Sequence, residues 1–265
     1  ITYYTFLILL VFGIYELVDV IRRKTLPPFL KSLGLLIVAA IIAVGVNFAA
    51  LYTTWEYGKE STRGKSDLAK DDAGEGRGLD KAYITQWSYG IDETFTLLIP
   101  NFRGGATAPF DRDSQTVKEL RKNNMAQAQD QLYSYWGKQP STSGPVYFGA
   151  IILFLFVYGL FIIRGKEKWW ILTAVLLSLV LSWGKNLMPV SSFFIDFFPG
   201  YNKFRAVSMI LVIAGLCVPL LSVLALKAVT EGSVSREKAL KGLLTSALIT
   251  GGLAFIFFIL PGLAG

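Results

Sequence analysis

Long apolar runs, separated by polar connections, dominate the sequence. A helix crosses the hydrocarbon core of a bilayer with about 20 mainly apolar residues at about 1.5 Å rise each, and most of the runs are long enough to do so. The run 169–183 is shorter, so it can cross only if Lys168 or Lys185 extends its side chain to the headgroups or if the bilayer is locally thinner. The runs cover residues 1–20, 33–55, 146–163, 169–183, 207–226 and 242–260.

This pattern predicts an all-α polytopic membrane protein with about six transmembrane helices and one mixed extracytoplasmic loop domain. Buried helices of a large soluble core are the alternative, but six such runs in one chain favour the membrane. We expect transmembrane helices 1 and 2 in residues 1–51, the loop domain in 52–145, and helices 3–6 in 146–265. A re-entrant or interfacial segment is expected on the outer side at 187–200.

The distribution of Lys and Arg sets the expected orientation. The connections after the first, third and fifth runs carry eleven of them, whereas the short connection 184–206 carries three. Because short cytoplasmic loops are enriched in these residues, both ends of the chain are predicted outside, together with 52–145 and 184–206. The net charge of +7 then comes mainly from loops that face anionic lipid, and it gives no indication of nucleic-acid binding.

The predicted loop domain, 52–145, has a balanced charge of 12 Lys or Arg against 13 Asp or Glu. Residues 58–78 are polar and rich in glycine, which predicts a mobile loop. Residues 83–102 are rich in aromatics and predict a short strand or an interfacial segment. Residues 114–135 predict a polar helix with a thin apolar stripe.

The composition excludes several kinds of catalytic and metal site from this chain. The chain is 53% hydrophobic and 17% charged and contains no histidine, which excludes histidine-based catalysis and histidine-ligated metal sites within it. Cys217 is the only cysteine, so no intrachain disulfide forms, and no metal ligands are assigned. Because the sequence starts inside an apolar run without an initiator Met, we expect an internal fragment of a longer protein.

The segment 193–205, FFIDFFPGYNKFR, is the first candidate for chemistry. It surrounds one aspartate with phenylalanines, breaks at a Pro-Gly pair and ends with Lys203 and Arg205 before an apolar run. Two cations beside a helix N-terminus suit a lipid phosphate or diphosphate. The alternative is that both side chains snorkel to ordinary phospholipid headgroups.

A second candidate lies just outside the second apolar run, where Glu56, Glu60 and Arg63 stand close together in sequence. A carboxylate near the bilayer surface can act as a general base or bind sugar hydroxyls, and the arginine can hold a phosphate. A solvated helix end with an i,i+3 or i,i+4 ion pair is the alternative.

A third candidate is the pair Asp92 and Glu93, which stands among aromatics with Trp87 and Arg103 nearby. The indole is a platform for a sugar, although it suits an aromatic belt equally well. Adjacent carboxylates point apart on a strand, so a joint two-carboxylate mechanism is expected only if the segment is a turn. The outer polar set is completed by Lys185 and Asn186.

Five sequence blocks in a fixed order carry a family resemblance. They are EYGKESTRG (56–64), LDKAYITQWSYGIDETFTLLIPNFRGG (79–105), YWGKQPSTSGPVYFGA (135–150), LSWGKN (181–186) and FFIDFFPGYNKFRAVSMILVIA (193–214). Together they resemble the YfhO family of bacterial membrane proteins in its Bacteroidetes-like form, over nearly the whole chain. The resemblance implies a glycosyltransferase C-like protein of the bacterial inner (cytoplasmic) membrane.

Such a protein is expected to transfer a sugar from a polyprenyl-phosphate donor to a cell-envelope acceptor outside the cytoplasm. The implied partners are membrane lipids, the lipid-linked sugar donor and a glycan or glycopolymer acceptor, with no cofactor assigned beyond the donor. Proteins of this type usually place their catalytic acid in the first external loop, which is expected upstream of this fragment.

Three groups of residues therefore form the predicted site. Candidates for the catalytic carboxylate within the chain are Glu56, Glu60, Asp92 and Glu93. Lipid-phosphate contacts are expected from Lys203, Arg205, Tyr201 and Asn202. Substrate contacts are expected from Arg63, Trp87, Arg103, Lys185 and Asn186.

Two other functions stay open on the sequence: a transporter or flippase of lipid-linked sugars, and a non-catalytic membrane scaffold. Transporters more often carry ionisable residues and broken helices at mid-membrane. Here the notable residues inside the predicted spans are Asn47, Ser178 and Pro219, which argues against ion coupling but leaves a flippase open.

Overall fold

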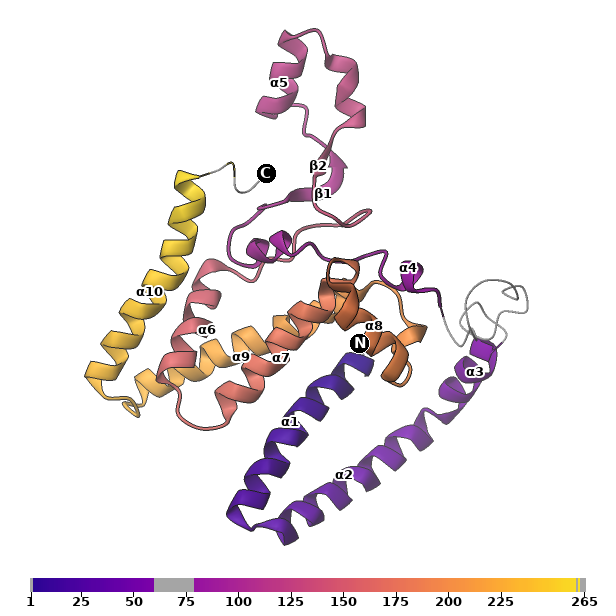
Figure 1. Cartoon of the computed structure of the whole chain (residues 1–265), viewed down its shortest axis with the longest axis vertical. Coiled ribbons are helices and arrows are strands. Elements are labelled where there is room, and N and C mark those ends of the chain that lie inside the picture. Colours follow the sequence, from indigo (N-terminus) through magenta and orange to yellow (C-terminus); the bar gives the residue numbers. More distant parts are fainter. Residues whose placement is uncertain (1, 60–78, 261, 263–265) are drawn as a thin grey trace. The chain divides into compact units, whose positions relative to one another are not determined.

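The computed structural model describes residues 2–59, 79–260 and 262, and nearly all of its regular structure is helical (Figure 1). The chain divides into two compact units, which are described separately. The first unit combines Ile1–Ile84 with Ser191–Arg205, and the second combines Thr85–Val190 with Ala206–Gly265. The division into three consecutive parts, 1–51, 52–145 and 146–265, stays a prediction from the sequence.

The first unit consists of helices and short turns. Two prolines occupy the first turn of α2, where their missing N–H groups cost nothing, and no residue of this helix is buried. An apolar helix with every side exposed suits a lipid environment. The next helix, α3, runs through residue 52, which was the expected start of the loop domain. The helices are α1 (Thr2–Arg23), α2 (Leu26–Val46), α3 (Phe48–Lys59), α4 (Lys81–Ile84) and most of α8 (Met188–Phe197).

A helical bundle forms the core of the second unit, in which α9 packs against both α6 and α7, and α6 packs against α10. Buried Ser222 joins two of these helices, because its hydroxyl lies 2.8 Å from the carbonyl oxygens of both Ile152 on α6 and Val218 on α9. Such interhelical contacts are typical of membrane bundles. The bundle helices are α6 (Ala150–Ile162), α7 (Glu167–Ser182), α9 (Leu211–Thr230) and α10 (Arg236–Ile259).

The second unit also contains a two-stranded antiparallel sheet. Strand β1 (Gly104–Pro109) pairs with β2 (Tyr133–Tyr135), with Gly104 opposite Tyr135, Pro109 opposite Tyr133 and an irregular register between them. The chain between the strands contains α5 (Gln115–Lys122) and a 3₁₀ helix (Ala126–Gln131). Figure 1 shows this excursion above the sheet.

The predicted helix over 114–135 is therefore much shorter than expected. It begins as the pattern indicates, because Ser114 caps α5 by accepting a hydrogen bond from the N–H of Val117 at 3.3 Å. It ends at Asn123, and Asn124 adopts a positive φ of 59°. Asparagine tolerates this left-handed conformation, which terminates a helix. In 83–102 the structure forms a 3₁₀ helix (Asp92–Leu97) in place of the strand that was one of two expectations.

Four described helices are long and apolar enough to cross a membrane, and the number rises to five if α7 and Gly184–Phe197 count as one broken span. Helix α6, with 13 residues, is shorter. These helices confirm the predicted class, an all-α membrane protein, whereas the count of six spans stays a prediction. The four are Tyr3–Arg23, Leu26–Val46, Val207–Thr230 and Arg236–Ile259.

Close packing of α6 on α9 depends on Gly159, and this gives a first test. A Cβ atom at that position would lie 2.9 Å from Cγ and 3.1 Å from the carbonyl oxygen of Leu221. We expect Gly159→Val to lower the stability by about 1–3 kcal/mol through overpacking, measured as a lower Tm in detergent. The control is Gly251→Val on α10, where a Cβ atom meets nothing within 4 Å. Equal effects of the two substitutions would contradict the α6–α9 contact.

Candidate functional site

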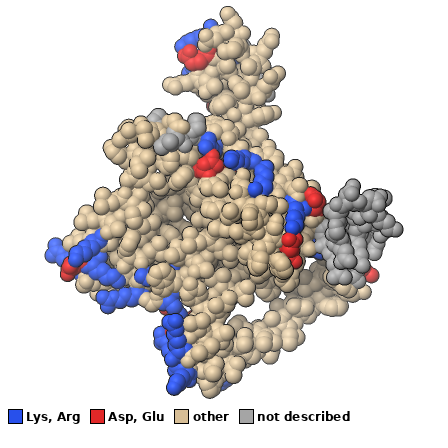
Figure 2. All heavy atoms as spheres, in the orientation of Figure 1, with Lys and Arg blue, Asp and Glu red and all other residues tan. Residues whose placement is uncertain are grey.

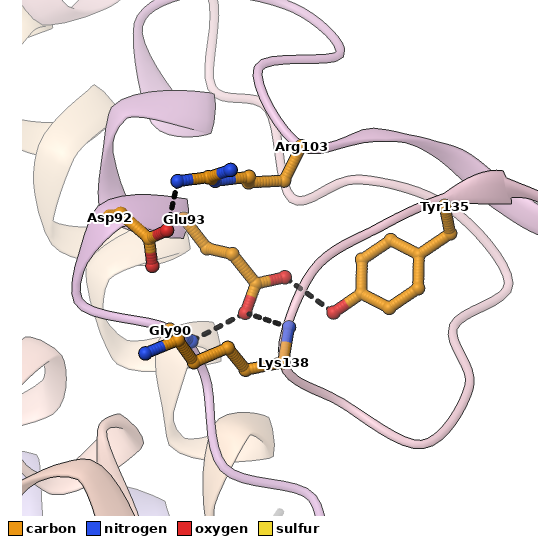
Figure 3. A network of polar contacts seen from close by, with 6 residues as sticks. All are labelled: Gly90, Asp92, Glu93, Arg103, Tyr135 and Lys138. Carbon is orange, nitrogen blue, oxygen red and sulfur yellow. Dashed lines mark hydrogen bonds and ion pairs between the residues drawn. The ribbon is translucent and has the colours of Figure 1, made fainter. Parts of the chain in front are cut away.

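Buried Glu93 is the centre of a polar network in the second unit. Its side chain is 2% exposed and lies in the 3₁₀ helix Asp92–Leu97. Its carboxylate accepts hydrogen bonds from the backbone N–H of Gly90 at 2.5 Å, the hydroxyl of Tyr135 at 2.5 Å and the N–H of Lys138 at 3.4 Å (Figure 3). These donors compensate the loss of water around a buried carboxylate.

Aromatic contacts place the 3₁₀ helix that carries Glu93. The ring of Phe95 packs against Phe257 of α10 at a centroid distance of 4.8 Å, and Phe102 contacts the same ring at 4.8 Å. The indole N–H of Trp183 donates a hydrogen bond to the hydroxyl of Thr94 at 3.0 Å. The network is thus fixed to the end of α7 and to α10.

Tyr135, the last residue of β2, connects the sheet to the polar network of Glu93. Its hydroxyl donates to Glu93 and accepts a hydrogen bond from the N–H of Gln139 at 2.9 Å. Burial, together with the hydrogen bond to the neighbouring carboxylate, raises the pKa of Tyr135 above its ordinary value. The phenol therefore stays protonated at neutral pH and acts as a donor. Gly137 allows this approach, because a Cβ there would collide with both Glu93 Oε1 and the hydroxyl of Tyr135.

An ion pair between Asp92 and Arg103 flanks Glu93 (Figure 3). Within the part of the chain that the structure describes, Oδ1 of Asp92 and Nε of Arg103 are buried without a hydrogen-bond partner. The neighbouring cavity, which Glu93, Arg103 and Tyr135 help to line, has a volume of about 10 Å³. A space of this size holds at most one water molecule, and a sugar does not fit.

The network therefore has the geometry of a structural centre. The carboxylate of Glu93 is surrounded by three donors, and Asp92 is occupied by its arginine partner. The two carboxylates are not arranged as a pair around a substrate, although the segment is a turn. Glu93 is buried among its donors, so its carboxylate is not available to an acceptor hydroxyl, as a general base must be.

The four predicted phosphate contacts, Tyr201, Asn202, Lys203 and Arg205, lie in the first unit. We group Lys203 and Arg205 with Lys81 and Tyr83 of the same unit as the cation corner. The guanidinium of Arg205 donates to the hydroxyl of Tyr83 at 2.8 Å and lies 5.6 Å from the centre of its ring. Lys81 forms an ion pair of 2.7 Å with Asp196 of α8. Lys203 is half-buried in the 3₁₀ helix Tyr201–Lys203.

Backbone and aromatic contacts hold the cation corner together. The N–H of Leu79 donates to the carbonyl of Asn202 at 3.0 Å, which connects the chain just before α4 to the 3₁₀ helix Tyr201–Lys203. Gly200 supplies the left-handed turn, with a φ of 76°. The ring of Tyr201 is 5% exposed and packs against Phe194 at 5.8 Å and Tyr3 of α1 at 6.3 Å. Tyr201 is thus part of the packing, and its side chain is not presented to a ligand.

Arg205 does not stand at the first turn of a long helix. It lies in a segment without regular secondary structure, two residues before a short 3₁₀ helix (Val207–Ile210), and α9 follows at Leu211. Ala206, between them, adopts a left-handed φ of 63°. The helix N-terminus that the sequence suggested directly beside the two cations is therefore displaced along the chain.

The remaining predicted residues are distributed over both units. Exposed Glu56 lies on α3, and Glu60 and Arg63 lie outside the described residues, as does the expected loop apart from its first two residues. In the second unit, Asn186 uses its side-chain amide to bind the carbonyl of Tyr89 at 2.8 Å, which indicates a structural role. Trp87 is half-buried and Lys185 is exposed.

Sequence reasoning missed Tyr135, Lys81 and Tyr83. Tyr135 and Glu93 are 42 residues apart, and no periodic pattern connects them. All three lie inside the blocks that carry the family resemblance, but no signal in the sequence singled out these residues themselves. Among the described residues, no three Cys, Asp or Glu side chains gather as metal ligands.

We compared the chain with protein families, curated proteins and solved structures. No family model matches the chain, and no curated protein or solved structure matches it either. The resemblance to the YfhO family therefore stays a prediction from the sequence blocks.

The role of Glu93 can be tested with Glu93→Gln. The substitution keeps the size of the side chain but turns one acceptor into an NH₂ donor that faces other donors. We expect a loss of about 2–3 kcal/mol in stability and faster amide exchange at Gly90 and Lys138, measured by hydrogen exchange. The control is Glu119→Gln on α5, whose exposed pair with Lys122 contributes little. Unchanged protection in Glu93→Gln would refute the structural role.

A second test uses pH. Because the pKa of Tyr135 is raised in the folded protein, the unfolded chain loses this proton first, at its ordinary value near 10. The stability contributed by the protonated phenol is thus complete below pH 10 and is lost as the pH rises above it. We expect the advantage of the wild type over Tyr135→Phe in Tm to be constant up to pH 9 and to shrink at higher pH. Tyr133→Phe, at an exposed position of the same strand, should show no such loss.

Proposed function

We propose that this chain is part of an integral membrane glycosyltransferase-like protein, which transfers a sugar from a polyprenyl-phosphate donor to a cell-envelope acceptor. The observation that carries the proposal is the cation corner. It joins Arg205 to Tyr83, and Lys81 to Asp196 in the aromatic segment before Lys203, which is of the kind that lies at headgroup depth in a membrane. The resemblance of the sequence blocks to the YfhO family supports the same function.

The proposed topology has six spans in a bacterial cytoplasmic membrane. They are α1, α2 with the first residues of α3 up to residue 51, α6, α7, α9 and α10. Both ends of the chain lie outside, together with residues 52–145 as a loop domain and residues 184–206. Helices α6 and α7, with 13 and 16 residues, are shorter than the usual 20 and need local thinning or flanking cations at the interface. The alternation of basic connections supports this orientation.

In the proposed reaction, the bond between the sugar C1 and the donor phosphate oxygen breaks, and a bond from C1 to the acceptor oxygen forms. The acceptor hydroxyl gives its proton to a carboxylate, and the electron pair of the broken bond stays on the departing phosphate. Lys203 and Arg205 stabilise that negative charge. Tyr83 keeps the guanidinium in place through its hydroxyl and its ring face.

The base in this reaction is proposed to be a carboxylate outside the Glu93 network. The carboxylates of Asp92 and Glu93 are engaged in the network described above, which leaves Glu56 as the exposed candidate among the described residues. The Glu93 network then supports the loop domain and takes no direct part in the chemistry.

A flippase for lipid-linked sugars is the second candidate function, and one observation favours it. Helix α7 and the segment Gly184–Phe197 form a broken pair, and discontinuous helices are common at the substrate sites of transporters. A flippase also needs cations for the donor phosphate, so the cation corner alone does not separate the two functions. A non-catalytic scaffold would need neither donor binding nor transfer.

An assay in proteoliposomes separates these functions. The full-length protein is supplied with polyprenyl-phosphate-linked sugars and a cell-envelope glycan acceptor, and both donor movement and sugar transfer are followed. Transfer to the acceptor is expected. Movement of the donor across the bilayer without transfer would replace the enzyme with the flippase, and the absence of both would leave the scaffold.

The cation corner gives a site-specific prediction. We expect the double variant Lys203→Gln, Arg205→Gln to weaken donor binding by about tenfold or more, because each lost cation–phosphate contact is a charge-assisted hydrogen bond. The matched control is Arg112→Gln, Lys118→Gln, which removes the same charges from exposed positions in the second unit. Binding of the labelled donor in detergent is the measurement. Unchanged affinity in the Lys203, Arg205 variant would leave only snorkelling to ordinary headgroups.

A further inference from the structure

Two lysines, Lys238 and Lys241, line a pocket that none of the predicted functions uses. The pocket lies in the second unit, beside the end of α6 and the first turns of α10, and has a volume of about 370 Å³. This volume lies in the range of small-molecule sites. Figure 2 shows Lys and Arg gathered over the turn between α9 and α10, with an acidic patch among them. Residues lining the pocket include Phe161, Ser235, Glu237, Lys238, Lys241 and Thr245.

Two lysines from different helices converge on the end of α6. The ammonium of Lys238 on α10 donates to the carbonyl of Ile162 at 2.9 Å, and that of Lys168 on α7 donates to the carbonyl of Leu160 at 2.9 Å. These bonds satisfy the last carbonyls of α6, which is a structural role. An ammonium group has three N–H donors, so this role leaves each lysine with further capacity to bind an anion.

The charges around the pocket are not balanced by acidic side chains. Lys241 pairs with Glu237 at 2.6 Å, but in the described part of the chain Arg164, Lys168 and Lys238 form no ion pair with Asp or Glu. The positive charges of Arg164 and Lys168 also act on the ammonium of Lys238. Lys238 lines the pocket, whereas Arg164 and Lys168 stand outside its lining, and an anion bound at Lys238 reduces the repulsion among the three charges.

The walls of the pocket suit a lipid more than a free ion. The 24-residue helix α10 begins here, capped by Ser235, whose hydroxyl accepts from the N–H of Lys238 at 3.4 Å. Its N-terminal dipole adds to the attraction for a negative charge. The ring of Phe161, which is 41% exposed, supplies an apolar wall at the end of a membrane helix. Basic pockets between membrane helices are typical sites for anionic lipid headgroups.

We propose that this pocket binds the phosphate group of an anionic phospholipid. The phosphate contacts Lys238 in the wall of the pocket, the charges of Arg164 and Lys168 add to the attraction, and an acyl chain lies against Phe161 of α6. The proposal concerns a structural lipid and is independent of the sugar donor and the cation corner. In the orientation proposed above, the lipid belongs to the cytoplasmic leaflet.

The test measures saturable lipid binding by the purified full chain in neutral detergent. Phosphatidylglycerol, phosphatidylcholine and inorganic phosphate are titrated separately, and bound lipid is counted by native mass spectrometry while Tm is followed in parallel. We expect phosphatidylglycerol to bind with a defined stoichiometry and to raise Tm, phosphatidylcholine to bind at least about tenfold more weakly, and millimolar phosphate to compete only partly. If phosphate alone saturates the site and abolishes lipid binding, the ligand is a free anion and the lipid proposal fails.

Variants connect the binding to the pocket. Arg164→Gln, Lys238→Gln is expected to weaken phosphatidylglycerol binding about tenfold, whereas the charge-matched control Arg112→Gln, Lys118→Gln leaves it unchanged. Equal losses in both would show a non-specific attraction to the net charge and would overturn the proposal. Should the double variant fail to fold, the exposed Arg164→Gln alone carries the test, and Lys238→Arg should retain binding because it keeps the charge.

Discussion

The exclusion of water from the hydrocarbon core constrains everything else in this structure. A backbone polar group without a partner there costs several kcal/mol, so the spans must be helices and polar side chains must find partners within them. The hydroxyls in the bundle follow this rule. Several of them bind carbonyls of their own helix three or four residues earlier: Ser178, Ser182, Ser222, Ser246 and Thr250. Irregular chain and charge are accordingly found at the ends of the spans.

This constraint explains which parts of the fold could be predicted. Apolar length alone identifies the membrane class and the helices α1, α2, α9 and α10, because each must match the same bilayer thickness. Apolar length does not give the start of α6 correctly. The apolar run begins at residue 146, but the helix begins at Ala150, after Gly149 with a φ of 101°. The apolar pattern indicates which residues lie in lipid, but it does not indicate where the backbone turns and a helix begins.

The candidate site was less predictable because its contacts join distant segments. Glu93 was a candidate on the sequence, but its partner Tyr135 gave no local signal, and the pairing of β1 with β2 brings them together. Similarly, Lys203 and Arg205 were found from their position after a Pro-Gly break, whereas Tyr83, which holds the guanidinium, lies 122 residues away in sequence. Residue type and spacing identified one member of each contact, and the tertiary structure was needed for the other.

The short sheet has a consequence for how this protein can vary. The strands fix Gly104 opposite Tyr135 and Pro109 opposite Tyr133, so the chain between them leaves and returns through two neighbouring points. Lengthening such an excursion adds only a small loop-closure entropy, about 0.6 kcal/mol for a doubling of its length. Insertions, deletions or an entire added domain between residues 110 and 132 would therefore leave Tyr135 on Glu93. The sheet separates a region that is free to diversify from a core that is not.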